Sequence, residues 1–203
     1  MTHSTSDNDP RREAILKAAA DLFFERGYAE TSIDAIIERV GGSKRTLYRL
    51  FGNKPGLFEA IIRENGKSLF AETTDAAPGP LPFETALEQF ATRLLELTVQ
   101  PRTVAIYRVV VSEAPRFPDL GRIFFEHGPL RGKEWLIQTL ARAASEGIVT
   151  LPDPEAAAGI FMGMVRNDLQ QQMILGLRQT PSSAEIRQIA RAATTVFLDG
   201  IRN

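Results

Sequence analysis

The sequence predicts an all-α protein, in which a three-helix domain with a helix-turn-helix is followed by a helical bundle. Apolar residues recur at helical spacing along most of the 203 residues, no β pattern or internal repeat stands out, and Gly- and Pro-containing breaks separate the periodic segments. We expect a disordered N-terminal arm over residues 1–10, a helix-turn-helix domain over 11–56 and a second helical domain over 57–203.

The first helix is expected to run from Asp9-Pro10 to about Arg26. Aspartate is a favoured helix cap and proline fits the first helical turn, so this dipeptide is a good helix start. Gly27-Tyr28 ends the helix, and we expect the Tyr28 ring to pack in a three-helix core.

Two short helices joined by a tight turn are expected within Thr31–Lys54. Thr31 lies three residues before Asp34, which is a helix start of the capping-box kind. The apolar stripe of this helix consists of Ile33, Ile36, Ile37 and Val40. Gly41-Gly42 ends it, because glycine accepts the φ > 0 geometry of a tight turn without steric cost. Ser43 is expected to cap the next helix, SKRTLYRLF.

This next helix is expected to have a basic and aromatic face. At about 100° per residue, its polar and apolar side chains fall on opposite sides. The polar side carries Lys44, Arg45, Tyr48 and Arg49. Arg and Lys donate hydrogen bonds to phosphates and guanine edges, and a Tyr hydroxyl can reach a phosphate. A solvated charged face is the alternative, but the helix-turn-helix frame favours an element that enters a DNA groove.

The charge distribution is compatible with DNA binding, although the net charge of the chain is −1. Residues 11–64 hold ten basic and eight acidic side chains, and the segment from Arg39 to Lys54 holds five positive side chains and no negative one. Local concentration of charge, rather than the global sum, sets the attraction of phosphates. Arg11 and Arg12, near the start of the first helix, fit a contact to the DNA backbone and a solvated position equally well.

Two pieces of this region, AILKAAADLFFERGYAETSIDAI and SKRTLYRLFGNKPGLF, have a specific spacing of Gly, Thr, Leu-Tyr, Phe and Lys. Through them residues 11–64 resemble the DNA-binding domain of the TetR/AcrR family of bacterial transcriptional regulators. The resemblance implies phosphate contacts from Thr31, Tyr48 and Lys54, and base-facing side chains at Lys44, Arg45 and Thr46. With Ser43 and Arg49, these residues form the predicted DNA-binding set.

The turn departs from the family pattern. The family usually has Ala-Gly-Val there, and this chain has Val40-Gly41-Gly42. The turn thereby lacks an apolar anchor, so we expect the helices around it to be placed more loosely than usual.

The rest of the chain is also expected to be helical. A fourth helix from Pro55 to about Thr73 precedes a Pro- and Gly-rich loop at Asp75–Pro82. The remaining expected helices are Phe83–Val99, a helix that starts at Pro101, Leu120–His127, Leu130–Glu146, Asp153–Leu175 and Ala184–Ile201.

The segment YRVVVSEAPRFPDLGRIFFEHGP resembles the AefR-like C-terminal domain found in part of the same family, over roughly residues 83–176. This resemblance implies an all-helical regulatory domain that dimerises and can bind a small molecule. The residues support a homodimer independently, because the last two helices, at about 153–175 and 184–201, are rich in small and apolar side chains. Packing of these helices inside one subunit is the alternative.

A pocket for a small-molecule effector is expected in the second half of the chain. A mostly apolar cavity with a few polar groups suits such a ligand. The candidate lining residues are Tyr107, Phe124, His127, Trp135, Met164, Asn167, Asp168 and Gln171. Met and Phe at helical spacing are more often core residues, so ordinary packing is the alternative.

Composition and motifs argue against several functional classes. Zero cysteines exclude disulfides, thiolate zinc sites and cysteine nucleophiles, and His3 and His127 are the only histidines. We expect no metal, no cofactor and no enzymatic activity, because the sequence shows no nucleophile–base constellation, metal-ligand cluster or Gly-rich phosphate loop after a strand. No apolar run of about 18 residues indicates a membrane span, and the polar N-terminus lacks the core of a signal peptide, so a cytoplasmic protein is expected.

The predicted function is that of a DNA-binding transcriptional regulator. We expect a ligand-responsive repressor that binds a palindromic operator as a homodimer and is released by a small molecule. Repression is implied by the resemblance, because the residues themselves do not distinguish repression from activation. A protein–protein interaction module that has lost sequence-specific DNA binding is the alternative hypothesis.

Overall fold

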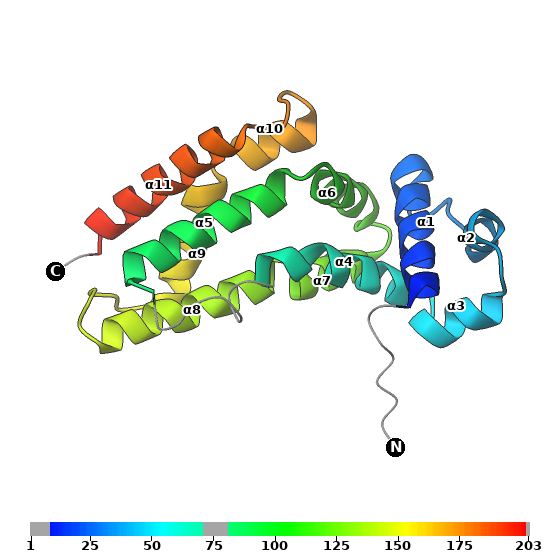
Figure 1. Cartoon of the computed structure of the whole chain (residues 1–203), viewed down its shortest axis with the longest axis horizontal. Helices are drawn as coiled ribbons and strands as arrows, with labels where there is room; N and C mark the ends of the chain where they lie inside the picture. Colours follow the sequence, from blue (N-terminus) through cyan, green and yellow to red (C-terminus); the bar gives the residue numbers. More distant parts are fainter. Residues whose placement is uncertain (1–8, 71–80, 202–203) are drawn as a thin grey trace, which may run out of the picture. The chain divides into compact units, whose positions relative to one another are not determined.

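The computed structural model describes residues 9–70 and 81–201 (Figure 1). Within these ranges the regular elements are helices, as the sequence predicts. The first group is α1 (Pro10–Arg26), α2 (Ile33–Val40), α3 (Lys44–Phe51) and α4 (Lys54–Phe70). The others are α5 (Phe83–Val99), α6 (Pro101–Glu113), α7 (Pro118–His127), α8 (Pro129–Ser145), α9 (Pro154–Arg166), α10 (Leu169–Leu175) and α11 (Ser183–Asp199).

Some expected features lie outside the described residues. These are the N-terminal arm, apart from Asp9 and Pro10, and most of the loop at Asp75–Pro82. Pro10 is already the first residue of α1, and the Asp9 side chain caps this helix by accepting a hydrogen bond from the Arg11 N–H at 2.9 Å. In the described residues, no helix combines the length and the apolar character that crossing a membrane requires.

The chain divides into two compact units. The first unit consists of residues 1–65 and 105–127, and the second of residues 66–104 and 128–203. Helices α4 and α6 each begin in one unit and end in the other. This division differs from the boundary expected at residue 56, because the first half of α4 and the second half of α6 are buried in the same core as α1.

The core of the first unit is built around aromatic rings. The Tyr28 ring, with 4% of its surface exposed, lies 5.2 Å from Phe23, 5.8 Å from Phe58 and 5.4 Å from Phe117 between centroids. Burial raises the pKa of the Tyr28 phenol to about 12. Helices α6 and α7 add Ile106, Val109, Val110, Leu120 and Ile123 to this core. The expected place of Tyr28 in the core is therefore confirmed, and the core extends well beyond three helices.

The start of α2 differs from the prediction by one residue. Ser32, rather than Thr31, is the cap, and its hydroxyl oxygen accepts a hydrogen bond from the Ala35 N–H at 3.0 Å. The Thr31 side chain turns inward, where its hydroxyl lies 3.1 Å from the Leu22 carbonyl and 2.8 Å from the Gly27 carbonyl. Thr31 thus fastens the end of α1 to the start of α2.

The second unit packs α5 against α9, α10 and α11, and α8 against α9. Helix α11 lies alongside α5 over much of its length (Figure 1). The Phe161 and Phe197 rings join α9 to α11 with centroids 4.8 Å apart, and the Phe90 and Trp135 rings stack at 5.0 Å between α5 and α8. These contacts form an apolar core separate from that of the first unit.

The prediction of a single helix over Asp153–Leu175 is wrong, because the helix is interrupted at Asn167. The Asn167 backbone has φ 46°, a left-handed value that asparagine tolerates better than most residues. Helix α9 therefore ends at Arg166, and α10 starts at Leu169. The apolar spacing continues across the break, so periodicity alone predicted one helix.

The buried Thr31 hydroxyl leads to a prediction about stability. Thr31→Val keeps the shape of the side chain but leaves the Leu22 and Gly27 carbonyls without this donor, so the free energy of unfolding should fall by about 1–3 kcal/mol. Denaturant unfolding followed by circular dichroism measures the change. Thr31→Ser retains the hydroxyl and serves as the control for loss of the methyl group. Wild-type stability in the valine variant would mean that these hydrogen bonds contribute nothing.

Candidate nucleic-acid interface

Helix α3 has the two contrasting sides that the sequence predicts. Leu47 and Phe51 are buried, and Leu50 is partly buried on the same side. The exposed side carries Lys44, Arg45, Tyr48 and Arg49. Tyr48 has 46% of its surface exposed, so its ring and hydroxyl are accessible on this side of the helix. The helix therefore presents an exposed surface of cationic and aromatic side chains.

The predicted base-facing Lys44 has an acidic neighbour that the sequence argument missed. The Lys44 ammonium lies 2.7 Å from the Asp34 carboxylate of α2, and both side chains are exposed. The hydrogen bond to Asp34 raises the pKa of Lys44. The expectation of a face without acidic residues holds for α3 itself, but the turn brings Asp34 beside it.

Arg45 and Arg49 form no side-chain hydrogen bond or ion pair within the described part of the chain. Arg39, by contrast, is held by two hydrogen bonds to the Glu25 carboxylate, at 3.1 and 2.9 Å. This pair lowers the pKa of Glu25 and raises that of Arg39, mainly through the hydrogen bonds. The guanidinium groups of Arg45 and Arg49 are therefore available to an anionic partner, whereas Arg39 ties α2 to α1.

The two hydroxyl residues of the predicted set lie together at the start of α3. The Ser43 oxygen accepts a hydrogen bond from the Thr46 N–H at 3.2 Å, which confirms Ser43 as the cap of this helix. The Ser43 and Thr46 hydroxyls lie 3.1 Å apart. Ser43 is exposed and Thr46 partly buried, so both border the exposed side of α3.

Two predicted phosphate contacts bind carbonyls of the first unit, Thr31 as a buried side chain and Lys54 as a partly buried one. Thr31 is 1% exposed, and its hydroxyl lies within hydrogen-bond distance of two carbonyls, between which its single proton is shared. Lys54 starts α4, one residue earlier than expected, and its ammonium donates to the Tyr28 carbonyl and, at 3.4 Å, to the Ala29 carbonyl. It also lies 4.2 Å from the centroid of the Tyr28 ring. Burial lowers the pKa of Lys54, against the opposing effect of Glu113.

The sequence left the role of Arg11 open between a contact to the DNA backbone and a solvated position, and the structure shows a third arrangement. Its guanidinium donates to the Val40 carbonyl at 3.1 Å and to the Gly41 carbonyl. It thereby links the first turn of α1 to the turn before α3. No spacing pattern could locate this contact, because 29 residues separate Arg11 from Val40.

The predicted effector-pocket residues are divided between the units. In the first unit, the Tyr107 and Phe124 rings meet edge to face at 5.4 Å, and the His127 imidazole lies 3.2 Å from the Glu59 carboxylate. The second unit holds Trp135, Met164, Asn167, Asp168 and Gln171. Of these, Trp135 stacks on Phe90, Met164 lines a groove between α9 and α11, and the other three are exposed. That these residues line one pocket stays a prediction.

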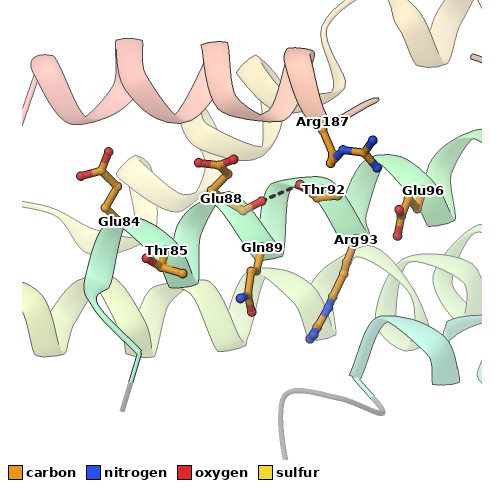
Figure 2. Close-up of a pocket in the computed structure, with 8 residues that line it drawn as sticks. All are labelled: Glu84, Thr85, Glu88, Gln89, Thr92, Arg93, Glu96 and Arg187. Atoms are coloured by element: carbon orange, nitrogen blue, oxygen red, sulfur yellow. Dashed lines mark hydrogen bonds between the residues drawn. The ribbon is translucent and has the colours of Figure 1, made fainter. Parts of the chain in front are cut away.

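A hollow of about 510 Å³ lies along α5 and α11 in the second unit (Figure 2). Its lining is charged or polar and consists of Glu84, Thr85, Glu88, Gln89, Thr92, Arg93, Glu96 and Arg187. The Thr92 hydroxyl donates to the Glu88 carbonyl at 2.8 Å, and the Glu88 carboxylate accepts from Arg191 at 3.2 Å. This lining differs from the apolar wall expected for an effector, and it contains none of the predicted pocket residues.

Comparison with known families and proteins agrees with this arrangement. The model of the bacterial regulatory proteins of the tetR family matches residues 15–61. The model of the AefR-like transcriptional repressor C-terminal domain matches residues 85–200, which is more than half of the chain. Both resemblances found in the sequence are confirmed.

Relatives and solved structures match over nearly the whole chain. The HTH-type transcriptional regulator YvkB of Bacillus subtilis is 25% identical over 197 residues, which cover 95% of this chain and 97% of that protein. The flavonoid-responsive regulator FrrA is 31% identical, with a TM-score of 0.76 over 95% of this chain and 97% of its own. A TetR transcriptional regulator from Agrobacterium tumefaciens is 25% identical, with a TM-score of 0.75 over 96% of each chain.

The α1–α3 arrangement, the exposed cationic side of α3 and these matches lead to one conclusion. The chain belongs to the TetR family of bacterial transcriptional regulators, a non-enzymatic family that binds DNA through a helix-turn-helix, and it carries an AefR-like C-terminal domain.

Proposed function

We propose that this regulator is a ligand-responsive repressor, which binds a palindromic operator as a homodimer and is released by a small molecule. The observation that carries the proposal is the exposed side of α3, where Arg45 and Arg49 have no partner in the described chain. The match to an AefR-like repressor domain supports repression, and the name of FrrA, a flavonoid-responsive regulator, supports a small-molecule effector. Such a regulator acts on the chromosome, so we place it in the cytoplasm.

In the proposed complex, α3 enters the major groove. Arg45, near the start of the helix, reaches base edges, where a guanidinium can bind guanine with two hydrogen bonds. Lys44 faces the same bases while Asp34 fixes its direction. Tyr48 and Arg49, further along the exposed side, bind phosphates and set the register of the helix. Thr31 and Lys54 support this surface from inside the first unit, because their polar groups are bound to the chain's own carbonyls.

The proposed dimer uses an apolar groove between α9 and α11. The groove has a volume of about 450 Å³, and its lining includes Ala156, Ala157, Ile160, Met164, Val196 and Phe197. Ile160 is 60% exposed and Val196 62% exposed. A side chain at Gly159 or Gly163 would meet open space in the single chain, so these positions allow close approach of another helix. A second copy fits because α9 and α11 of each subunit would together form a self-complementary four-helix interface.

The proposed response to an effector requires a link between the units, and α4 and α6, which each begin in one unit and end in the other, supply the chain for it. Helix α6 ends at Glu113, whose carboxylate accepts a hydrogen bond from the Ala29 N–H of the α1–α2 loop at 3.0 Å. Helix α7 ends at His127, beside Glu59 of α4. An effector would act by binding better to one spacing of the two DNA-binding units than to the other.

The test of the proposed function is selection of bound fragments from the source genome by the purified protein, followed by footprinting. A protected, roughly palindromic site is the expected result, with loss of binding on addition of an effector related to the neighbouring genes. No enrichment over bulk DNA at moderate salt would favour the alternative, an interaction module that has lost sequence-specific binding.

Two variants of α3 should separate base contacts from phosphate contacts. Arg45→Ala should relax the base preference at one position per half-site, at a cost of about 1–3 kcal/mol, whereas Tyr48→Phe should weaken binding to all sequences alike. Selection from a randomised operator library measures both effects. An unchanged preferred sequence in the Arg45 variant would contradict its assignment to the bases.

A charged residue in the α9–α11 groove should prevent dimerisation. Ile160→Asp places a carboxylate in the centre of the proposed interface, where desolvation of an unpaired charge is costly, so the protein should become a monomer and lose operator affinity. Sedimentation velocity measures the mass. Leu177→Asp is the matched control, because Leu177 is 74% exposed and lies outside the groove. A dimer that survives Ile160→Asp would place the interface elsewhere.

A further inference from the structure

We propose that Arg11 is a positioning residue for DNA recognition: its guanidinium clamps the turn between α2 and α3 and occupies the place where an apolar anchor would otherwise stand. This inference rests on the proposed function, since it concerns how α3 is aimed at the operator.

The clamp consists of one guanidinium and two carbonyls. Arg11 reaches from the first turn of α1 and donates to the Val40 and Gly41 carbonyls, which lie at the C-terminal end of α2. Carbonyls at this end of a helix lack partners within the helix, and they attract positive charge through the helix dipole. A planar guanidinium with several N–H donors can bind two of them at once, which a lysine ammonium does less well.

Gly42 makes the space for this clamp. Its backbone has φ +93°, a conformation that side chains disfavour, and a Cβ built there would overlap the Arg11 guanidinium. A side chain at position 42 would therefore force the Arg11 guanidinium to shift from this place. The loss of the apolar residue in the turn, which by itself predicts a loosely placed helix, is compensated by a polar contact from α1.

The clamp lies close to the residues that face DNA. Gly42 is followed directly by Ser43, the cap of α3, and then by Lys44 and Arg45. On the buried side of α3, Leu47 ends the first turn and Phe51 ends the helix. Residues 43–46 precede Leu47 and follow directly from the turn that Arg11 holds, so the direction of the Arg45 side chain depends on the geometry of that turn.

Arg11→Ala should lower affinity for the operator about tenfold, the expected cost of losing charge-assisted hydrogen bonds, with a much smaller change for non-specific DNA. The salt dependence of operator binding should keep its wild-type slope, because no phosphate contact is removed. Lys17→Ala is the matched control: it removes one positive charge from an exposed position on the same helix and should leave the ratio of operator to non-specific affinity unchanged.

Gly42→Ala tests the same clamp from the other side, because its Cβ displaces the guanidinium. If both variants act through the clamp, the double variant should bind the operator no more weakly than Gly42→Ala alone. Arg11→Lys should fall between wild type and Arg11→Ala. Thermal unfolding of each variant checks that the fold is intact, and should Arg11→Ala not fold, the lysine and Gly42 variants carry the test.

Three results would overturn the inference. One is an Arg11→Ala protein with wild-type selectivity. Another is an equal loss of affinity for operator and non-specific DNA, together with a decrease of about 1 in the slope of log affinity against log salt concentration. That result would make Arg11 a phosphate contact. The third is full additivity of the Arg11 and Gly42 variants. Failure of the wild-type protein to select any operator would instead contradict the proposed function, so the two failures are distinguishable.

Discussion

The first unit depends on the burial of the Tyr28 ring between elements that are distant in sequence. Phe23 of α1, Phe58 of α4 and Phe117 just before α7 all contact this ring, and the Lys54 ammonium lies over it. Because aromatic rings bury large areas, this cluster sets where the α1–α2 loop, α4 and α7 meet. Helix α2 is joined to α1 by the Arg39–Glu25 ion pair and the Arg11–Val40 hydrogen bond, and α3 packs against α2.

The cationic residues of the helix-turn-helix do two different jobs. Arg11, Arg39 and Lys54 bind carbonyls or a carboxylate inside the unit and hold its helices together. Arg45 and Arg49 extend from α3 without partners in the described chain. A count of positive charges therefore overstates the charge available to phosphates, and geometry identifies the residues that supply it.

Local rules predicted most helix ends and the two sides of α3, because caps, glycine turns and apolar spacing act over a few residues. Ser43 and Gly41-Gly42 illustrate this success. The same rules failed where a contact with a distant residue fixes the direction of a side chain, or where one backbone dihedral angle ends a helix. Asn167 breaks a helix whose apolar period continues. The partners of Arg11 and Lys54 lie more than 20 residues away, so no local pattern reveals that Lys54 points inward.

The shared core of the first unit has a consequence for how such regulators can exchange parts. Residues 105–127, although they follow α5 in the chain, contribute Ile106, Val109 and Leu120 to the same buried core as residues of α1 and α4. If recombination replaced only residues 1–65, the new α1 and α4 would have to pack against the unchanged residues 105–127. Chimeras with a new operator preference should therefore work best when the N-terminal segment is exchanged together with the end of α6 and α7. The first unit is therefore continuous in space, although its residues come from two separate segments of the sequence.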